Sequence, residues 1–241
     1  MVYEKRSYRY SFRAPDLKGF EVKVRETDLF LFAEKDLSEE TRKSVSKYRG
    51  QIEAYIRKDN KFLTTLTPYK PLSGASPIVW EMCEKAAAAG VGPMAAVAGA
   101  IAEYTGKELN KYSSQVIIEN GGDIFIKSRV KRKIGLYTGD PVIDKRFVME
   151  VGGGEACFGV CTSSGKIGHS LSFGKADAVT IISKSAVLAD AAATAVCNAV
   201  KEPSDIKKAI EFSKKIKGVD GVLIIIDRNV GMWGEIKLSG A

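Results

Sequence analysis

The chain has 241 residues, of which 45% are hydrophobic and 27% are charged, and its mean hydropathy is −0.08. This composition excludes a disordered or collagen-like chain, and the length suits a single domain spanning residues 1–241, or two intimately packed halves. The formal net charge of +8 favours anionic ligands such as phosphates. No recognisable nucleic-acid motif accompanies that charge, so a nucleic-acid partner is not expected.

No segment predicts a membrane span or a secretory signal. The longest uncharged run, residues 86–102, is rich in Ala and Gly and contains Pro93. It falls short of the roughly 20 strongly apolar residues that a spanning helix needs. The first 14 residues are charged and aromatic, unlike a signal peptide. We therefore expect a cytoplasmic protein whose four cysteines are free thiols.

The first half of the chain predicts strands, then helices, then strands. Ser38 is a plausible N-cap for an amphipathic helix over residues 38–58, and Gly90 is placed to stop a helix that starts at Ser76 and Pro77. A helix rich in small residues follows from Pro93 to Asn110. The predicted strands of this half are residues 7–12, 20–25, 29–32, 62–67, 114–119 and 124–128.

The second half repeats this order of elements. Its predicted strands are residues 146–151, 157–161, 178–182, 221–227 and 231–238, and its predicted helices are residues 184–200 and 204–217. Two successive blocks of strands, paired helices and strands predict an α+β fold with mostly antiparallel pairing. A basic cluster between the halves predicts a solvated strand edge; its members are Lys127, Arg129, Lys131, Arg132 and Lys133.

Two glycine-containing segments are candidates for binding phosphate. Gly121 and Gly122 join two apolar strands, where they permit either close backbone approach to a ligand or a simple hairpin turn. The densest polar cluster follows later in the chain and consists of Thr162, Ser163, Ser164, Gly165, Lys166 and the only histidine, His169. Hydroxyls and N–H groups of such a loop suit phosphate oxygens, and the histidine suits acid, base or ligand roles. A polar hairpin loop explains the same residues equally well.

Asp190 and Thr194 are four residues apart in a predicted helix, which places them on one face, one turn from each other. A carboxylate and a hydroxyl are hard oxygen ligands of the kind that Mg²⁺ accepts. The alternative is an aspartate near a helix start and a threonine packed in the core. Cys157 and Cys161 share one face of a strand, and they admit either buried free thiols or a reactive pair.

Four segments, taken in chain order, resemble the uncharacterised ApbE-like proteins of archaea and anaerobic bacteria. They are GPMAAVAGAIAE at residues 92–103, IENGGDIF at 118–125, TSSGKIGHSLSFGKAD at 162–177 and LADAAATAVCN at 188–198. The resemblance implies an ApbE-like α+β fold of duplicated T-fold-like halves, with mostly antiparallel sheets and packed helices.

The same segments are more distantly similar to the FAD:protein FMN transferases, which cleave FAD and attach FMN to a target protein using Mg²⁺. Their metal motif Ala-Asp-Ala-x-x-Thr falls on residues 189–194, which implies Asp190 and Thr194 as metal ligands. Their Gly-Gly-Asp-Ile motif and histidine imply Asp123 and His169 as catalytic residues. In the transferases Asp-Pro and Thr-Gly follow the histidine, whereas Ser-Leu-Ser-Phe-Gly follows His169. Their flavin-contacting N-terminal segment has no evident counterpart in residues 1–70.

Three functions follow as hypotheses. The first is binding of a phosphorylated ligand such as FAD or FMN with Mg²⁺, with transfer to a protein acceptor if the protein is an enzyme. The second is a step of sulfur assimilation and homocysteine formation, with Cys157 or Cys161 as the thiolate. The third is a non-catalytic flavin carrier. Dimerisation through strand edges suits this fold class, but no residue in the sequence specifies it.

Overall fold

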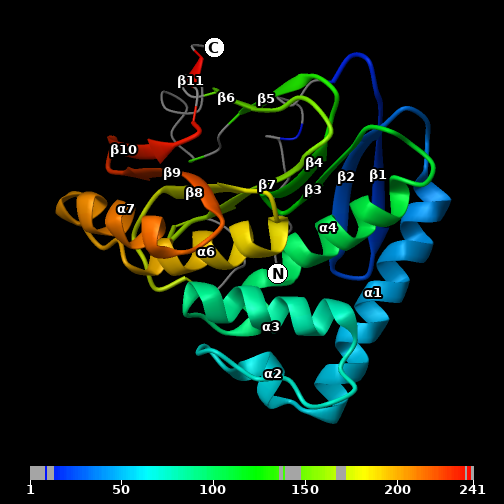
Figure 1. Cartoon of the computed structure of the whole chain (residues 1–241), viewed down its shortest axis with the longest axis horizontal. Helices are drawn as coiled ribbons and strands as arrows, with labels where there is room; N and C mark the ends of the chain where they lie inside the picture. Colours follow the sequence, from blue (N-terminus) through cyan, green and yellow to red (C-terminus); the bar gives the residue numbers. More distant parts are fainter. Residues whose placement is uncertain are drawn as a thin grey trace.

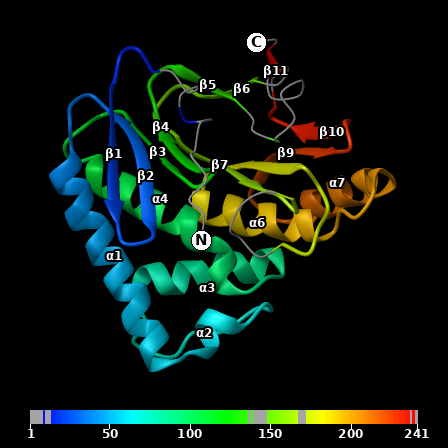
Figure 2. The same cartoon turned by 180° about the vertical axis from the view of Figure 1, so that it is seen from behind.

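The computed structural model describes residues 9, 14–135, 138, 148–166, 172–236 and 238–239. Figures 1 and 2 show a large sheet with a small sheet on one face and the helices on the other. The large sheet has the strand order β1-β2-β3-β4-β7-β8-β9-β10, and the small sheet has the order β11-β6-β5. Every described strand pairing is antiparallel.

The strands of the large sheet are β1 (Lys18–Val24), β2 (Thr27–Ala33), β3 (Val116–Asn120), β4 (Asp123–Lys127), β7 (Cys157–Ser163), β8 (Ala178–Ser183), β9 (Val219–Ile226) and β10 (Asn229–Gly234). Those of the small sheet are β5 (Lys131–Gly135), β6 (Val148–Gly152) and β11 (Leu238–Ser239). The helices are α1 (Ser38–Lys58), α2 (Lys61–Thr64), α3 (Pro77–Ala89), α4 (Val97–Leu109), α6 (Ala186–Asn198) and α7 (Ile206–Lys215), and the 3₁₀ turns are η2 (Pro93–Ala96) and η3 (Pro203–Asp205).

The large sheet contains the same arrangement of elements twice. Strands β1 and β2 precede the helices α1 to α4, and β3 and β4 follow them; β7 and β8 precede α6 and α7, and β9 and β10 follow. Each set of four strands is adjacent in the sheet, and β4 pairs with β7 where the two sets meet. The protein therefore has the α+β architecture with two T-fold-like halves that the sequence led us to expect.

The central strands are buried on both faces. Ile118 and Phe125 belong to the core on the helical side, whereas their chain neighbours Ile117 and Ile126 belong to the core under the small sheet. Because successive residues of a strand point to opposite faces, a sheet covered on both sides needs apolar residues throughout. This explains the uninterrupted apolar runs of β3 and β4.

Residues 62–67 do not form the predicted strand. Lys61–Thr64 is a short helix, α2, and only the extended residues after it resemble the expectation. The Phe62 ring packs edge-to-face on Tyr55, with centroids 5.1 Å apart, and is fully buried. The β-prone composition misled the prediction because burial of one aromatic side chain against α1 decides the local conformation.

Two helix starts also differ from expectation. Ser38 is the first residue of α1 rather than its cap, and Asp36 Oδ1 accepts hydrogen bonds from the Ser38 N–H and hydroxyl, at 3.0 and 2.6 Å. The predicted helix from Pro93 begins as the 3₁₀ turn η2 and becomes α-helical only at Val97. The helix after Ser76 is as predicted, and it ends at Gly90, whose φ of 79° is left-handed.

The basic cluster is not wholly a solvated edge. Arg132 points into the protein, where its Nε donates to Ser128 Oγ at 2.7 Å and its guanidinium pairs with Asp16. Lys131 and Lys133, on the opposite side of the same strand, are exposed. Alternation along β5 therefore separates one buried arginine from its lysine neighbours.

Some predictions concern residues outside those described, among them most of the strand at residues 7–12 and the start of the strand at 146–151. Among the described residues, no helix is by itself long and apolar enough to cross a membrane. The pair α3 and η2–α4 meets that length and composition only across a bend of 103°.

Candidate functional site

Two acidic residues meet where the halves join. Asp123 begins β4 and lies directly opposite Cys161 of β7. Helix α6 crosses this seam and carries Asp190, whose charge acts on Asp123, and Thr194 one turn further on. The structure thus brings Asp123 near Asp190, which is one of the two residues that the sequence singled out for a metal.

The two carboxyl groups are in an environment that disfavours negative charge. Burial raises the pKa of Asp123 well above its usual value, and the nearby Asp190 raises it further. Burial likewise raises the pKa of Asp190 to about 7. Asp123 Oδ1 is buried and has no hydrogen-bond partner among the described residues. A bound cation is one way in which such a pair of carboxylates is stabilised in its ionised form.

Asp190 also has a structural partner. Its Oδ2 accepts a hydrogen bond of 2.8 Å from the Gly99 N–H, and the Ala98 N–H lies within hydrogen-bonding reach as well. Both N–H groups belong to the first turn of α4, which has no side-chain cap of its own. The Asp190 carboxylate therefore caps α4, although it belongs to another helix. The hydrogen bonds from the two N–H groups reduce the free-energy cost of burying its negative charge.

Glu103 of α4 caps the start of α6 in the same way, and it was not identified from the sequence. It lies in α4, and its Oε2 accepts from Ser185 Oγ at 3.0 Å and from the Val187 N–H at 3.1 Å, both at the start of α6. Its Oε1 pairs with Lys107 Nζ at 2.6 Å. A glutamate within an Ala-rich helix carries no local signal of this role, because the contact depends on the crossing of two helices.

Gly99 permits that crossing. A Cβ at this position would lie 2.2 Å from the carbonyl oxygen of Ala186 and 2.8 Å from Asp190 Cβ. The small residues of α4 thus bring its first turn close enough for the capping contact. The neighbour against which these small residues pack is α6.

Gly121 and Gly122 form the hairpin turn between β3 and β4. Their φ values are 69° and 103°, as the central residues of a two-residue turn of this kind require. Glu119 Oε1 accepts from the Gly122 N–H at 2.9 Å, and Asn120 Nδ2 donates to the Ala98 carbonyl at 3.0 Å. The turn is thereby held beside the start of α4, next to Asp123.

The predicted phosphate loop begins within β7. Ser163 lies on the same face as Cys161 and near Cys197 of α6, and its hydroxyl is buried without a hydrogen-bond partner among the described residues. Thr162 points the other way and shares a hydrogen bond of 2.8 Å with Thr180. Gly165 is in close contact with the backbone of Gly174, so it packs rather than opening toward a ligand.

The positively charged residue of the predicted phosphate loop, Lys166, lies at its described end. Lys166 Nζ pairs with Asp177 at 2.7 Å and with Asp227 at 3.0 Å. Ser164 Oγ accepts from the Lys166 N–H at 3.1 Å. His169 lies outside the described residues. Within the described part of the chain, no cluster of three or more His, Cys, Asp or Glu side chains is arranged to hold a metal.

The two cysteines of the alternative hypothesis lie on the helical side of the sheet. Cys161 is fully buried, and its thiol donates to the Ala186 carbonyl at 3.4 Å, whereas Cys157 is partly exposed. Burial raises the pKa of both thiols, and Asp123 and Asp190 raise that of Cys161 further. Since the thiolate is the reactive form, this environment disfavours reactivity at either position.

Comparison with known proteins places the chain in a family. The family described as AbpE bacteria matches residues 11–234, so the protein belongs to this ApbE-like family. It is 41% identical over 219 residues to a UPF0280 protein of Methanocaldococcus jannaschii, covering 88% of this chain and 89% of that one. A UPF0280 protein of Methanopyrus kandleri is 40% identical over 221 residues, covering 89% of each chain.

Solved structures share the fold. The flavin transferase ApbE from Vibrio cholerae matches with a TM-score of 0.61 at 12% identity, over 91% of this chain and 97% of that one. The ApbE protein from Thermotoga maritima matches with a TM-score of 0.53 at 14% identity, over the same shares of the two chains. These likenesses establish the ApbE-like architecture.

Proposed function

We propose that the protein binds a phosphorylated ligand, such as a flavin nucleotide, together with Mg²⁺ at the junction of the two halves. The observation that carries this proposal is the pair of buried carboxyls, Asp123 and Asp190, with one oxygen of Asp123 unpartnered among the described residues. The similarity to structures named as flavin transferases supports the choice of ligand class.

The side chains present fit a hard divalent cation. Asp123 and Asp190 supply carboxylate oxygens, and Thr194, on the same face of α6 as Asp190, supplies a hydroxyl. Mg²⁺ is commonly held by one or two carboxylates while water and substrate phosphates complete its octahedron. When bound, it would offset the charge of the phosphate oxygens.

The surrounding backbone would hold the phosphates. Gly121 brings its N–H group beside Asp123, and residues 162–166 follow Cys161 on the neighbouring strand. The Gly122 N–H would first have to release Glu119 Oε1, to which it donates at 2.9 Å. Lys166 would have to exchange the partly buried Asp177 and the exposed Asp227 for the ligand. The exposed pair with Asp227 contributes only about 0 to 1 kcal/mol, so this part of the exchange costs little. His169 stays a candidate acid or base on sequence grounds.

The activity we propose is transfer of the flavin nucleotide to a hydroxyl of a protein acceptor, as in the transferases that the sequence resembles. A carrier that binds flavin without turnover uses the same site. Release of AMP from FAD in the presence of an acceptor distinguishes the two functions.

A thermal-shift titration tests the binding. FAD, FMN and ADP are added to the purified protein with and without Mg²⁺, and the Asp190→Asn variant serves as the comparison. Asparagine keeps an oxygen that accepts from the Gly99 N–H but removes the charge. At a ligand concentration about 100 times its Kd, we expect about 2.7 kcal/mol of Mg²⁺-dependent stabilisation in the wild type, and its loss in the variant. Equal stabilisation of both proteins would contradict the proposed site.

A further inference from the structure

The two outer edges of the large sheet differ in chemistry. At one edge, β1 exposes the charged side chains of Lys18, Glu21 and Lys23 and buries Phe20 and Val22. Charges of this kind discourage another strand from pairing with an edge. At the other edge β10, with the sequence Asn-Val-Gly-Met-Trp-Gly, carries no charged residue.

Strand β10 instead exposes apolar side chains. Val230 is 40% exposed, Met232 is 53% exposed and Trp233 is 37% exposed. Within the described residues, β10 pairs only with β9. An apolar strand with one side open is suited to accept an additional strand, through main-chain hydrogen bonds and contacts to alternate side chains.

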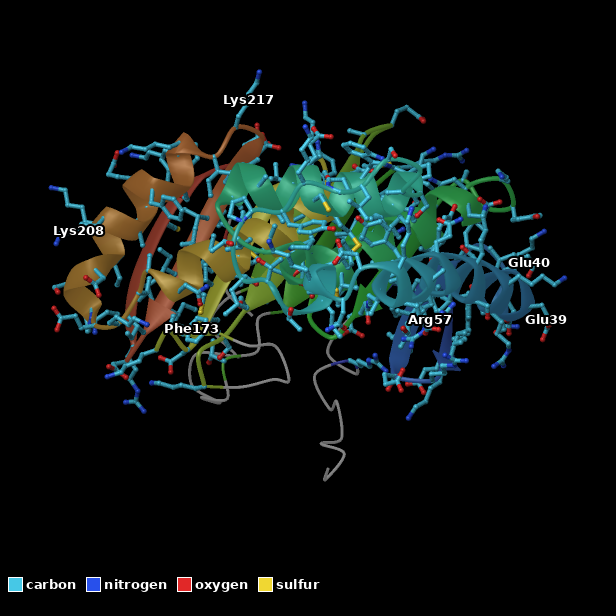
Figure 3. All side chains as sticks on the ribbon, turned by 90° about the horizontal axis from the view of Figure 1, so that it is seen from below. Glu39, Glu40, Arg57, Phe173, Lys208 and Lys217 are labelled. Carbon is cyan, nitrogen blue, oxygen red and sulfur yellow. The ribbon has the colours of Figure 1, made fainter. Side chains whose placement is uncertain are left out.

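Helix α7 places positively charged side chains beside this edge of the sheet. Ile206 and Ile210 pack against Gly231, and Lys214 Nζ lies 5.6 Å from the centre of the Trp233 ring, so α7 runs along β10. Residues 206–217 contain five lysines and one glutamate, a surplus of four positive charges. Lys207 and Lys208 are exposed, and Figure 3 shows Lys208 and Lys217 pointing away from the molecule.

We infer that β10 is a docking edge for an acidic, extended segment of a partner protein, which adds to the sheet as a further antiparallel strand. The uncharged strand would supply the pairing and the apolar contacts, and the lysines of α7 would attract the acidic side chains. A second copy of the chain fits less well, because pairing β10 with β10 would bring the two lysine-rich helices together. This inference does not depend on the proposed flavin site.

Hydrogen exchange with a defined peptide tests the inference. The probe is a peptide of alternating glutamate and valine, and the comparison peptide has lysine in place of each glutamate. We expect the acidic peptide to slow exchange of the amides in residues 229–234 and the basic peptide to leave them unchanged. Protection by both peptides, or by neither, would overturn the inference.

Charge variants sharpen the test. In Lys207→Glu with Lys208→Glu, which leaves the contact between Lys214 and Trp233 in place, we expect the acidic peptide to bind at least about tenfold more weakly at low salt. The matched control, Lys18→Glu with Lys23→Glu at the β1 edge, should bind as the wild type does. Unchanged affinity of the α7 variant for the acidic peptide would contradict the inference. It would also be contradicted if the protein without peptide sedimented as a dimer and the amides of β10 were protected from exchange in that dimer.

Discussion

Helices α4 and α6 each begin against a carboxylate that belongs to the other helix. Glu103 of α4 accepts from the first turn of α6, and Asp190 of α6 accepts from the first turn of α4. Glu103 is paired with Lys107, whereas the charge of Asp190 acts on another acid, Asp123. Both carboxylates cap a helix. The charge of Glu103 is compensated by Lys107, whereas Asp190 and Asp123 together leave an excess of negative charge when both are ionised.

This difference distinguishes a carboxylate with a structural partner from the pair of carboxylates that we propose as a ligand site. A capping carboxylate with a lysine partner has its charge compensated within the fold. The pair formed by Asp190 and Asp123 is not compensated within the described residues, and the pKa of each is raised. We therefore propose the Mg²⁺ site at Asp190 and Asp123, where the capping carboxylate has no lysine partner among the described residues.

The largest expected effect is a pH dependence of stability that originates at the uncompensated contact. Burial raises the pKa of Asp190 to about 7, so the folded protein holds a proton that the unfolded chain releases near pH 4. Without divalent cations, the free energy of unfolding should fall as pH rises from about 4 to about 7, by on the order of 4 kcal/mol. Urea unfolding across this range measures it.

The Asp190→Asn variant is the control for that pH dependence. Its slope between about pH 4 and 7 should be smaller, because one of the two buried titrating carboxyls is gone and only Asp123 remains. Mg²⁺ should also reduce the slope in the wild type, since a cation favours the ionised carboxylates. An unchanged slope in the variant would mean that other groups dominate the titration.

The next effect concerns the close approach of the two helices. In Gly99→Ala the new methyl group would meet the Ala186 carbonyl oxygen at 2.2 Å, so one backbone must move. We expect a loss of about 3 kcal/mol in the free energy of unfolding. Gly50→Ala in α1, where no atom lies within 4 Å of the added group, should instead stabilise by about 0.5 to 1 kcal/mol. Equal midpoints of urea unfolding would contradict the packing argument.

The smallest effect tests the compensated carboxylate. Glu103→Gln keeps an oxygen for the Val187 N–H but removes the anionic partner of Lys107. We expect a loss of about 1 to 2 kcal/mol in stability, with the Mg²⁺-dependent response to ligand retained. Asp190→Asn should show the opposite result, with the response lost. If both variants lost the response, the two carboxylates would not be functionally distinct.

Much of the fold was predictable because it depends on local patterns. The apolar runs of β3 and β4, the Gly-Gly turn between them and the stop of α3 at Gly90 were identified correctly from neighbouring residues. Residues 62–67 were assigned to the wrong element because a single buried contact, Phe62 against Tyr55, outweighed their β-prone composition. The burial of Arg132 was missed because its partner, Asp16, lies 116 residues away.

The sequence by itself determined most of the order of strands and helices, the repeated arrangement of the two halves and the candidates Asp190 and Thr194, and the family resemblance added Asp123. The sequence did so because periodicity and turn chemistry act over a few residues, and because the motifs are contiguous. Only the tertiary structure decided that Asp123 lies beside Asp190, that Glu103 and Asp190 cap each other's helices, and that β10 is an uncharged edge. These properties depend on which distant segments share a low-dielectric interior, where charge, hydrogen bonding and packing are settled together.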